Sequence, residues 1–234
     1  MRLALLLLAL LALPLDALAE RCRPAKGADL AGCDFTDAKL ENADLRDARL
    51  EGAVFRGANL KWANLGGARL KGAVFTDSDL FHATFDRADM TGADLSRANL
   101  FGTNLIGTNL SRVDLRGAYL KDVLMEGADL SGADLSGVYM LRAVIEGATL
   151  RGTNLSGADM TGAAAENADF TDARLVGTRL SGASIRFARF VRCDLQGADF
   201  ARADMQNTLF EGARNIPQGV LDNVAAFFGA EGRR

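Results

Sequence analysis

The sequence predicts an all-β solenoid, in which short extended segments stack in four-sided coils. From Leu30 to Phe210 a large apolar residue stands at every fifth position, and 36 of these 37 residues are Leu, Phe, Met or Ile, with Ala165 as the exception. The segment "RLEGAVF" at Arg49 returns as "RLKGAVF" at Arg69, and this offset of 20 residues indicates four pentapeptides per coil. An α-helix would repeat its apolar residues every three or four positions and a strand every two, so neither explains a period of five.

Two further positions of the repeat support one short extended side followed by a turn. The residue two before the large one is small, and it is Ala in 26 of the 37 cases, so both side chains are expected to point inward. The residue two after it is Gly in 20 cases, which suits a turn with a positive φ. About nine coils would form a rod roughly 45 Å long. Inward phenylalanines are expected to stack in two columns, Phe35, Phe55 and Phe75 in one and Phe170, Phe190 and Phe210 in the other.

Repeats such as "ADLRD", "ANLKW" and "ADLSG" resemble the pentapeptide-repeat family, whose pattern is A(D/N)LXX. The resemblance covers roughly four-fifths of the chain. It implies a right-handed quadrilateral parallel β-helix. Because family members have many roles, it does not name a function.

The start of the chain lies outside the repeat and is interpreted as a signal peptide in residues 1–19. A basic start is followed by an apolar run that Pro14 ends, and Ala17-Leu18-Ala19 is a small-x-small cleavage signal. A mature chain from Glu20 in the periplasm or the medium is therefore expected. The alternative is an N-terminal membrane anchor, for which the apolar run is short. Residues 20–27 would then form an N-terminal segment and residues 28–214 the β-helix.

The three cysteines have different expected roles. In an oxidising compartment Cys22 and Cys33 could pair and fix the N-terminal segment to the first coil. The alternative is that Cys33 is one more small inward residue and Cys22 is free. Cys193 occupies the same small inward position and is expected to be a buried, unreactive thiol.

Residues 215–234 are predicted to form a helical cap and a tail. After Pro217 the apolar residues follow helical spacing, and an open sheet edge needs a cover. A dimerisation element is the alternative. The apolar residues are Val220, Leu221, Val224, Phe227 and Phe228.

One side of the rod, centred on Leu40, Leu60, Leu80 and their successors, carries outward aromatic residues. We call this set the aromatic side, and it holds the chain's one Trp, one His and both Tyr. The next side adds Ile106, Leu124 and Val144, and Phe187 further along. Such a cluster predicts an interface, although cross-coil packing that stiffens the rod would also explain it. The members are Trp62, Phe81, His82, Phe101, Tyr119, Tyr139 and Leu141.

No catalytic, cofactor or metal motif is present, so an enzyme is not expected. The favoured function is an exported scaffold or interaction rod that binds a protein partner or a second copy of itself, without nucleic acid or stable membrane insertion after cleavage. Two alternatives remain open: a DNA-mimicking inhibitor of gyrase, which is a role of some family members, and a passive envelope rod. A net charge of −3, with Arg and Lys on every side, argues against DNA mimicry.

Overall fold

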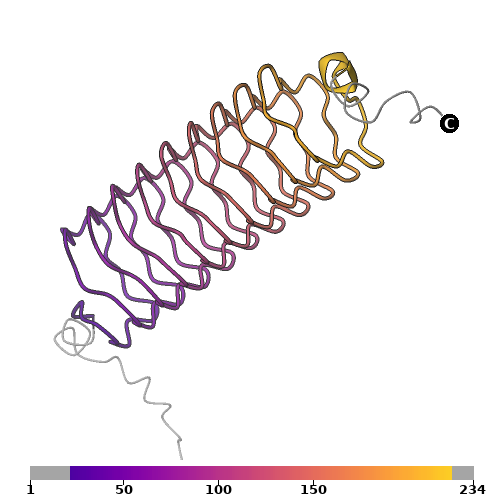
Figure 1. Cartoon of the computed structure of the whole chain (residues 1–234). Coiled ribbons are helices and arrows are strands. Elements are labelled where there is room, and N and C mark those ends of the chain that lie inside the picture. Colours follow the sequence, from indigo (N-terminus) through magenta and orange to yellow (C-terminus); the bar gives the residue numbers. More distant parts are fainter. Residues whose placement is uncertain (1–21, 223–234) are drawn as a thin grey trace, which may run out of the picture.

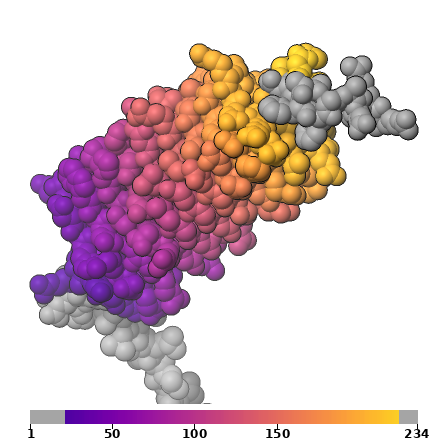
Figure 2. Space-filling model, viewed as in Figure 1, coloured from indigo at the N-terminus to yellow at the C-terminus, as the bar shows by residue number. Residues whose placement is uncertain are grey.

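The computed structural model describes residues 22–222, which form one right-handed quadrilateral β-helix (Figure 1). The coils stack along a straight rod, with the N-terminal segment at one end and a short helix at the other (Figure 2). The fold predicted from the repeat is confirmed.

Neighbouring coils are joined by parallel bridges between residues 20 apart, from Asp29–Arg49 to Asp194–Arg214. Backbone bonds run along the rod at each side: Leu50 N donates to the carbonyl of Arg69 at 2.7 Å, Arg69 N to the carbonyl of Ala48 at 2.9 Å, and Gly52 N to the carbonyl of Lys71 at 3.0 Å. Each coil therefore satisfies the strand groups of the next one, and every residue keeps a fixed column along the rod.

The corners explain the polar part of the repeat. The residue two after each large apolar residue has a positive φ, as at Gly52 with 65°. The turn is closed by a backbone bond, for example Ala53 N to the carbonyl of Leu50 at 3.0 Å. Asp or Asn before the large residue accepts a bond from the backbone two residues later, as Asp34 Oδ1 does from Thr36 N at 2.9 Å. These side chains form Asx turns, so many of the outward carboxylates have a structural role in the repeat.

The core is a column of large apolar side chains within a shell of alanines. The rings of Phe35, Phe55 and Phe75 stack with centroids 5.0 and 4.7 Å apart, as expected. The second predicted stack, formed by Phe170, Phe190 and Phe210, has spacings of 4.5 and 5.4 Å. Ala165 is fully buried on its ladder. Stability therefore comes from stacking between neighbouring coils.

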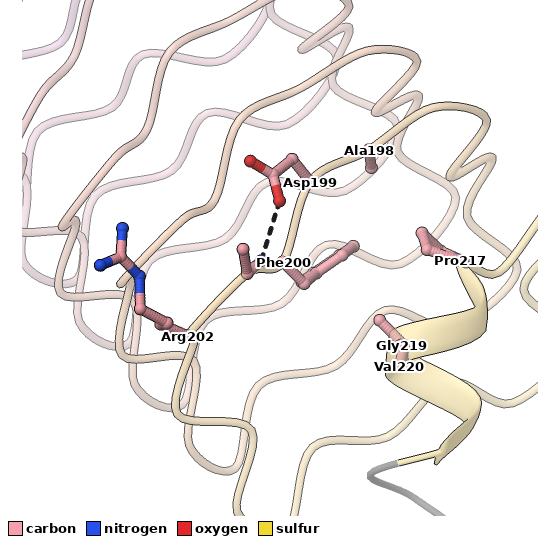
Figure 3. A pocket seen from close by; sticks show the side chains of 8 residues that line it. Ala198, Asp199, Phe200, Arg202, Pro217, Gly219 and Val220 are labelled. Carbon is pink, nitrogen blue, oxygen red and sulfur yellow. Dashed lines mark hydrogen bonds between the residues drawn. The ribbon is translucent and has the colours of Figure 1, made fainter.

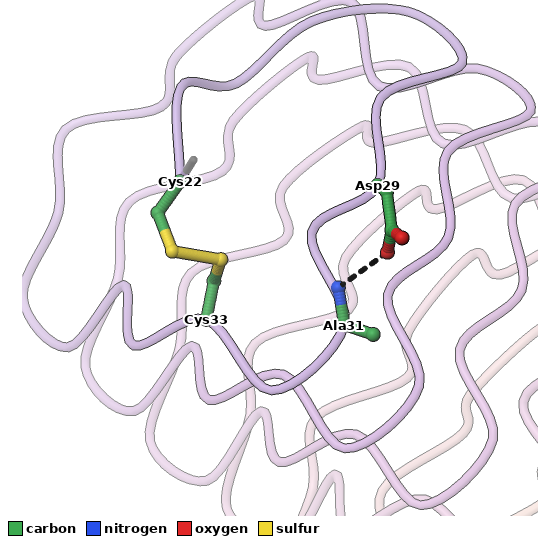
Figure 4. The surroundings of a disulfide bond; sticks show 4 residues. All are labelled: Cys22, Asp29, Ala31 and Cys33. Carbon is green, nitrogen blue, oxygen red and sulfur yellow. Dashed lines mark hydrogen bonds between the residues drawn. A yellow bond between two sulfur atoms is a disulfide. The ribbon is translucent and has the colours of Figure 1, made fainter. Parts of the chain in front are cut away.

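At the N-terminal end the structure joins Cys22 and Cys33 in a disulfide, with Cα atoms 5.7 Å apart (Figure 4). The bond ties the N-terminal segment across the mouth of the first coil. Residues 1–19, which carry the signal-peptide prediction, lie outside the described part of the chain.

At the C-terminal end a helix begins at residue 218 and is described up to 222. Val220 is buried against the core, but Leu221 is 44 % exposed. Adjacent helical residues point about 100° apart, so Val220 packs on the core while Leu221 stays exposed. Val224, Phe227 and Phe228, the other residues expected on this face, lie outside the described residues.

Candidate interaction surface

The structure brings the aromatic side together as one continuous run of rings. Tyr119 and Tyr139 occupy the bridging position of successive coils. Phe81 and Phe101 stand at the first residue of the following corner, and Trp62 at the second. The period of 20 residues thus places side chains from separate coils beside one another.

Consecutive rings touch along the rod. Trp62 meets Phe81 edge to face at 5.5 Å between centroids. Phe81 stacks on Phe101 at 5.3 Å, Phe101 on Tyr119 at 6.2 Å, and Tyr119 on Tyr139 at 5.3 Å. Because the stacked rings cover one another's faces, they present mainly their edges to the solvent. This geometry suits a partner with a flat, largely apolar surface better than one that must stack on an open ring.

The rings remain accessible despite this packing. Trp62 is 52 % exposed and the two tyrosines are 39 % and 37 % exposed. Phe81, Phe101 and Leu141 are half-buried. Every residue predicted for the aromatic side therefore reaches the surface, which is the condition for binding.

Two members of the aromatic side occupy backbone conformations that favour glycine. Trp62 has φ 55° and His82 has φ 52°, whereas most of the equivalent corner residues are Gly. The left-handed conformation costs about 1 to 2 kcal/mol in a residue with a Cβ. The imidazole of His82 lies edge-on to Phe81 and Phe101 and over Gly102, where any side chain would collide with it. The turns therefore do not require these two aromatic residues.

Charged residues line the aromatic side, and several are paired within the molecule. Lys61 Nζ lies 3.1 Å from Asp79 Oδ2. Arg142 donates to both carboxylate oxygens of Asp122 at 2.8 Å and lowers the pKa of that carboxyl. Lys121 lies over the ring of Phe101 at 5.7 Å. The surface is thus an apolar stripe with compensated charges at its edges.

These flanking charges are absent from the residues predicted from sequence. One of them could have been predicted from the sequence, because Lys121 shares a column with Phe81 and Phe101 at the spacing of 20. The pairing of Asp122 with Arg142 needed the structure, since many Asp and Arg residues share such columns.

Phe187 is also exposed, at 49 %, but it belongs to a different corner. Its φ is 59°, and its ring contacts the guanidinium of Arg186 at 6.0 Å. It therefore has the same backbone position as Trp62 without a place in the ring stack.

The rest of the described chain offers one pocket near its C-terminal end. A shallow pocket lies between the last coil and the helix, lined by Phe200, Arg202, Pro217 and Val220 among others (Figure 3). It is part of the junction between coil and cap, and its walls are both polar and apolar. Within residues 22–222, no group of three or more His, Cys, Asp or Glu side chains could hold a metal ion. In the same range no helix is long and apolar enough to cross a membrane.

Cys193 is buried, and its Sγ lies 2.9 Å from the carbonyl oxygen of Phe170. Burial raises the pKa of this thiol to about 12. Because the thiolate is the reactive form, Cys193 is an inert part of the core.

Comparison with known proteins agrees with the repeat geometry. The family model for pentapeptide repeats matches eight copies, in residues 26–57, 58–97, 98–137, 139–177 and 178–214. The chain is a pentapeptide-repeat protein. A search of curated proteins found no match.

Among solved structures, the chain is similar to HetL, a pentapeptide-repeat protein involved in heterocyst differentiation regulation in the cyanobacterium Nostoc sp. strain PCC 7120. The identity is 33 %, the match covers 80 % of this chain and 86 % of HetL, and the TM-score is 0.52. It is also similar to QnrB1, a plasmid-mediated fluoroquinolone resistance protein, at 22 % identity and a TM-score of 0.46, over 84 % and 94 % of the two chains. The second likeness carries no functional argument.

Proposed function

We propose that this protein is a non-catalytic interaction rod that works outside the cytoplasm and binds a protein through its aromatic side. The observation that carries the proposal is Trp62, a large, exposed ring in a left-handed corner position where the repeat usually has Gly. Phe187 shares this conformation and exposure, but only Trp62 also contacts a run of accessible rings. This combination is better explained by binding than by folding. Aromatic residues are also enriched in the cores of protein interfaces.

A passive rod is the second candidate, because the ring stack itself supports it. Rings that touch along the rod add packing between coils, and each aromatic pair contributes about 0.5 to 1.5 kcal/mol. This contribution explains Phe81, Phe101 and the tyrosines, but it explains Trp62 less well, since Trp62 contacts the stack only by an edge.

Replacement of Trp62 by Gly separates the two candidates. The variant restores the residue that the corner prefers and removes the largest ring from the surface. Phe187→Gly is the matched control, because it makes the same change at an equivalent, exposed corner outside the stack. Both variants and the wild type are used to capture partners from envelope extract and are compared by sedimentation.

The proposal predicts that Trp62→Gly loses partner capture or self-association while Phe187→Gly retains it. Equal binding by all three proteins would favour the passive rod. The substitutions Trp62→Ala, Phe101→Ala and Tyr119→Ala made together extend the test to the centre of the stripe, where interface aromatics can contribute 2 kcal/mol or more.

Export is the second part of the proposal and is supported by the apolar run before Ala17-Leu18-Ala19. N-terminal sequencing of the expressed protein should give Glu20 as the first residue. An intact Met1 in a soluble cytosolic fraction would contradict it.

A further inference from the structure

We propose that the partner of the aromatic side is a second copy of this chain, docked antiparallel about a twofold axis at the coil of Leu100. The inference rests on the proposed function, since it names the occupant of the same surface. It follows from how the columns of this side match themselves in the two possible orientations.

The aromatic side has a natural centre. Its rings extend from the coil of Leu60 to the coil of Met140, so the coil of Leu100 lies midway. A twofold axis that crosses the rod at the coil of Leu100 reverses the direction of the second copy. Each coil on one side of Leu100 then faces the copy's coil that lies equally far on the other side of Leu100. Such a rotation keeps each column opposite the same column of the copy. Phe101 then lies on the axis and meets the copy's Phe101.

The antiparallel arrangement pairs complementary groups in two of the three outward columns. In the bridging column, Asp79 lies opposite the copy's Tyr119, whose hydroxyl can donate to the carboxylate. In the outer corner column, His82 lies opposite Asp122 and Trp62 opposite Arg142, whose guanidinium is held flat by its two bonds to Asp122. Arg stacks readily on a Trp ring.

The antiparallel arrangement also pairs charged residues that lie outside the run of rings. Lys39 lies two coils from Asp79 and shares its column, and it is exposed. In the antiparallel arrangement it meets the copy's Asp159, which is half-buried and already paired with Arg179 at 3.1 Å. Opposite charges therefore meet outside the apolar stripe, and this arrangement both favours association and sets its register.

The parallel arrangement matches poorly. A twofold axis parallel to the rod leaves every coil at the same height as the identical coil of the copy. It reverses the order of the columns across the interface. Asp79 then lies against the copy's Phe81, and a carboxylate is pressed on an apolar ring edge. Asp79 keeps its ion pair with Lys61 but gains no donor from the copy. In the antiparallel arrangement it gains the hydroxyl of Tyr119, so this difference favours the antiparallel orientation.

Three asparagines at the bridging position provide matched reporters. Asn99 lies on the aromatic side at the axis, Asn59 lies on the same side two coils away, and Asn109 lies on the opposite side. Each accepts a backbone bond from the residue two positions on, at 3.2, 3.3 and 3.1 Å respectively. Replacement by Cys therefore costs the same turn bond at each site. Cys193 is buried and the other two cysteines are paired, so the new thiol is the accessible one within residues 22–222.

The mature full-length protein is studied by sedimentation over a wide concentration range, and each single variant is treated with a short bismaleimide. We expect a reversible dimer, and cross-linking of Asn99→Cys but not of Asn59→Cys or Asn109→Cys. Two copies of Asn59 would be separated by four coils, about 19 Å along the rod. Trp62→Gly should raise the dissociation constant of the dimer at least about 30-fold.

Three results would overturn the inference. Cross-linking of Asn59→Cys as well as Asn99→Cys would mean parallel rods, and cross-linking of Asn109→Cys would place the contact on another side. A protein that stays monomeric excludes the second copy as occupant. If that monomer captures another envelope protein in a Trp62-dependent manner, the proposed function stands without this inference; if Trp62→Gly changes no binding, both are wrong.

Discussion

The predicted bond between Cys22 and Cys33 can be tested by replacing Cys33 with Ala. Ala is the residue at this small inward position in 26 of 37 repeats, so the substitution removes the cross-link and still leaves a side chain that fits the inside of the coil. The bond closes a loop with a sequence separation of 11. Closing a loop of this size lowers the entropy of the unfolded chain and is worth about 3 kcal/mol.

Cys193→Ala is the control, since it removes an inward Cys that has no disulfide. It loses the contact with the Phe170 carbonyl and a little core volume, for about 1 kcal/mol. Urea unfolding of the oxidised proteins, followed by circular dichroism, gives the three free energies. Under reducing conditions the wild type should fall to the level of Cys33→Ala.

The reasoning would be refuted if the two Ala variants lost the same free energy under oxidising conditions. It would also fail if thiol counting on the unfolded, unreduced wild type gave three free thiols instead of one. Either result would leave the N-terminal segment tied to the rod only by its backbone bonds.

Three further predictions concern the surface and the core. The free energy of unfolding of Trp62→Gly should lie within about 1 kcal/mol of the wild type, because relief of the left-handed strain offsets the lost edge contact and the added freedom of Gly. Phe187→Gly should show the same small change. A loss above about 3 kcal/mol in urea for Trp62→Gly alone would make this ring structural. A hydrogen bond from Arg46 lowers the pKa of Asp44 from 3.8 to about 2. Because the folded pKa is depressed, this stabilisation is present above about pH 4 and should be lost as the pH falls toward 2, so the melting temperature should drop in that window, and less for Asp44→Asn. Cys193 should resist maleimide at pH 8 in the folded protein and react on unfolding, since its pKa is about 12; rapid labelling of the native state would contradict its burial.

Much of the fold was predictable from the sequence because the repeat is strict. A period of five fixes which side chains point inward, and a period of 20 fixes which residues share a column, so the phenylalanine stacks and the outward position of the aromatic side follow by counting. Corner residues with positive φ were expected where Gly recurs, and the structure places Trp62 and His82 in the same conformation.

What counting could not supply is the direction of each long side chain at the surface. Whether Tyr119 would turn toward Phe101, or Lys121 lie over its ring, depends on rotamers that neighbouring coils select together. At the C-terminal end the repeat stops, and helical spacing alone did not show that Val220 is buried while Leu221 is exposed. The sequence by itself determined the rod and the column of each repeat residue, because the backbone bonds between coils keep the 20-residue register along the rod. Only the tertiary structure decided which outward groups touch, because those contacts form between side chains 18 to 21 residues apart and depend on packing in three dimensions.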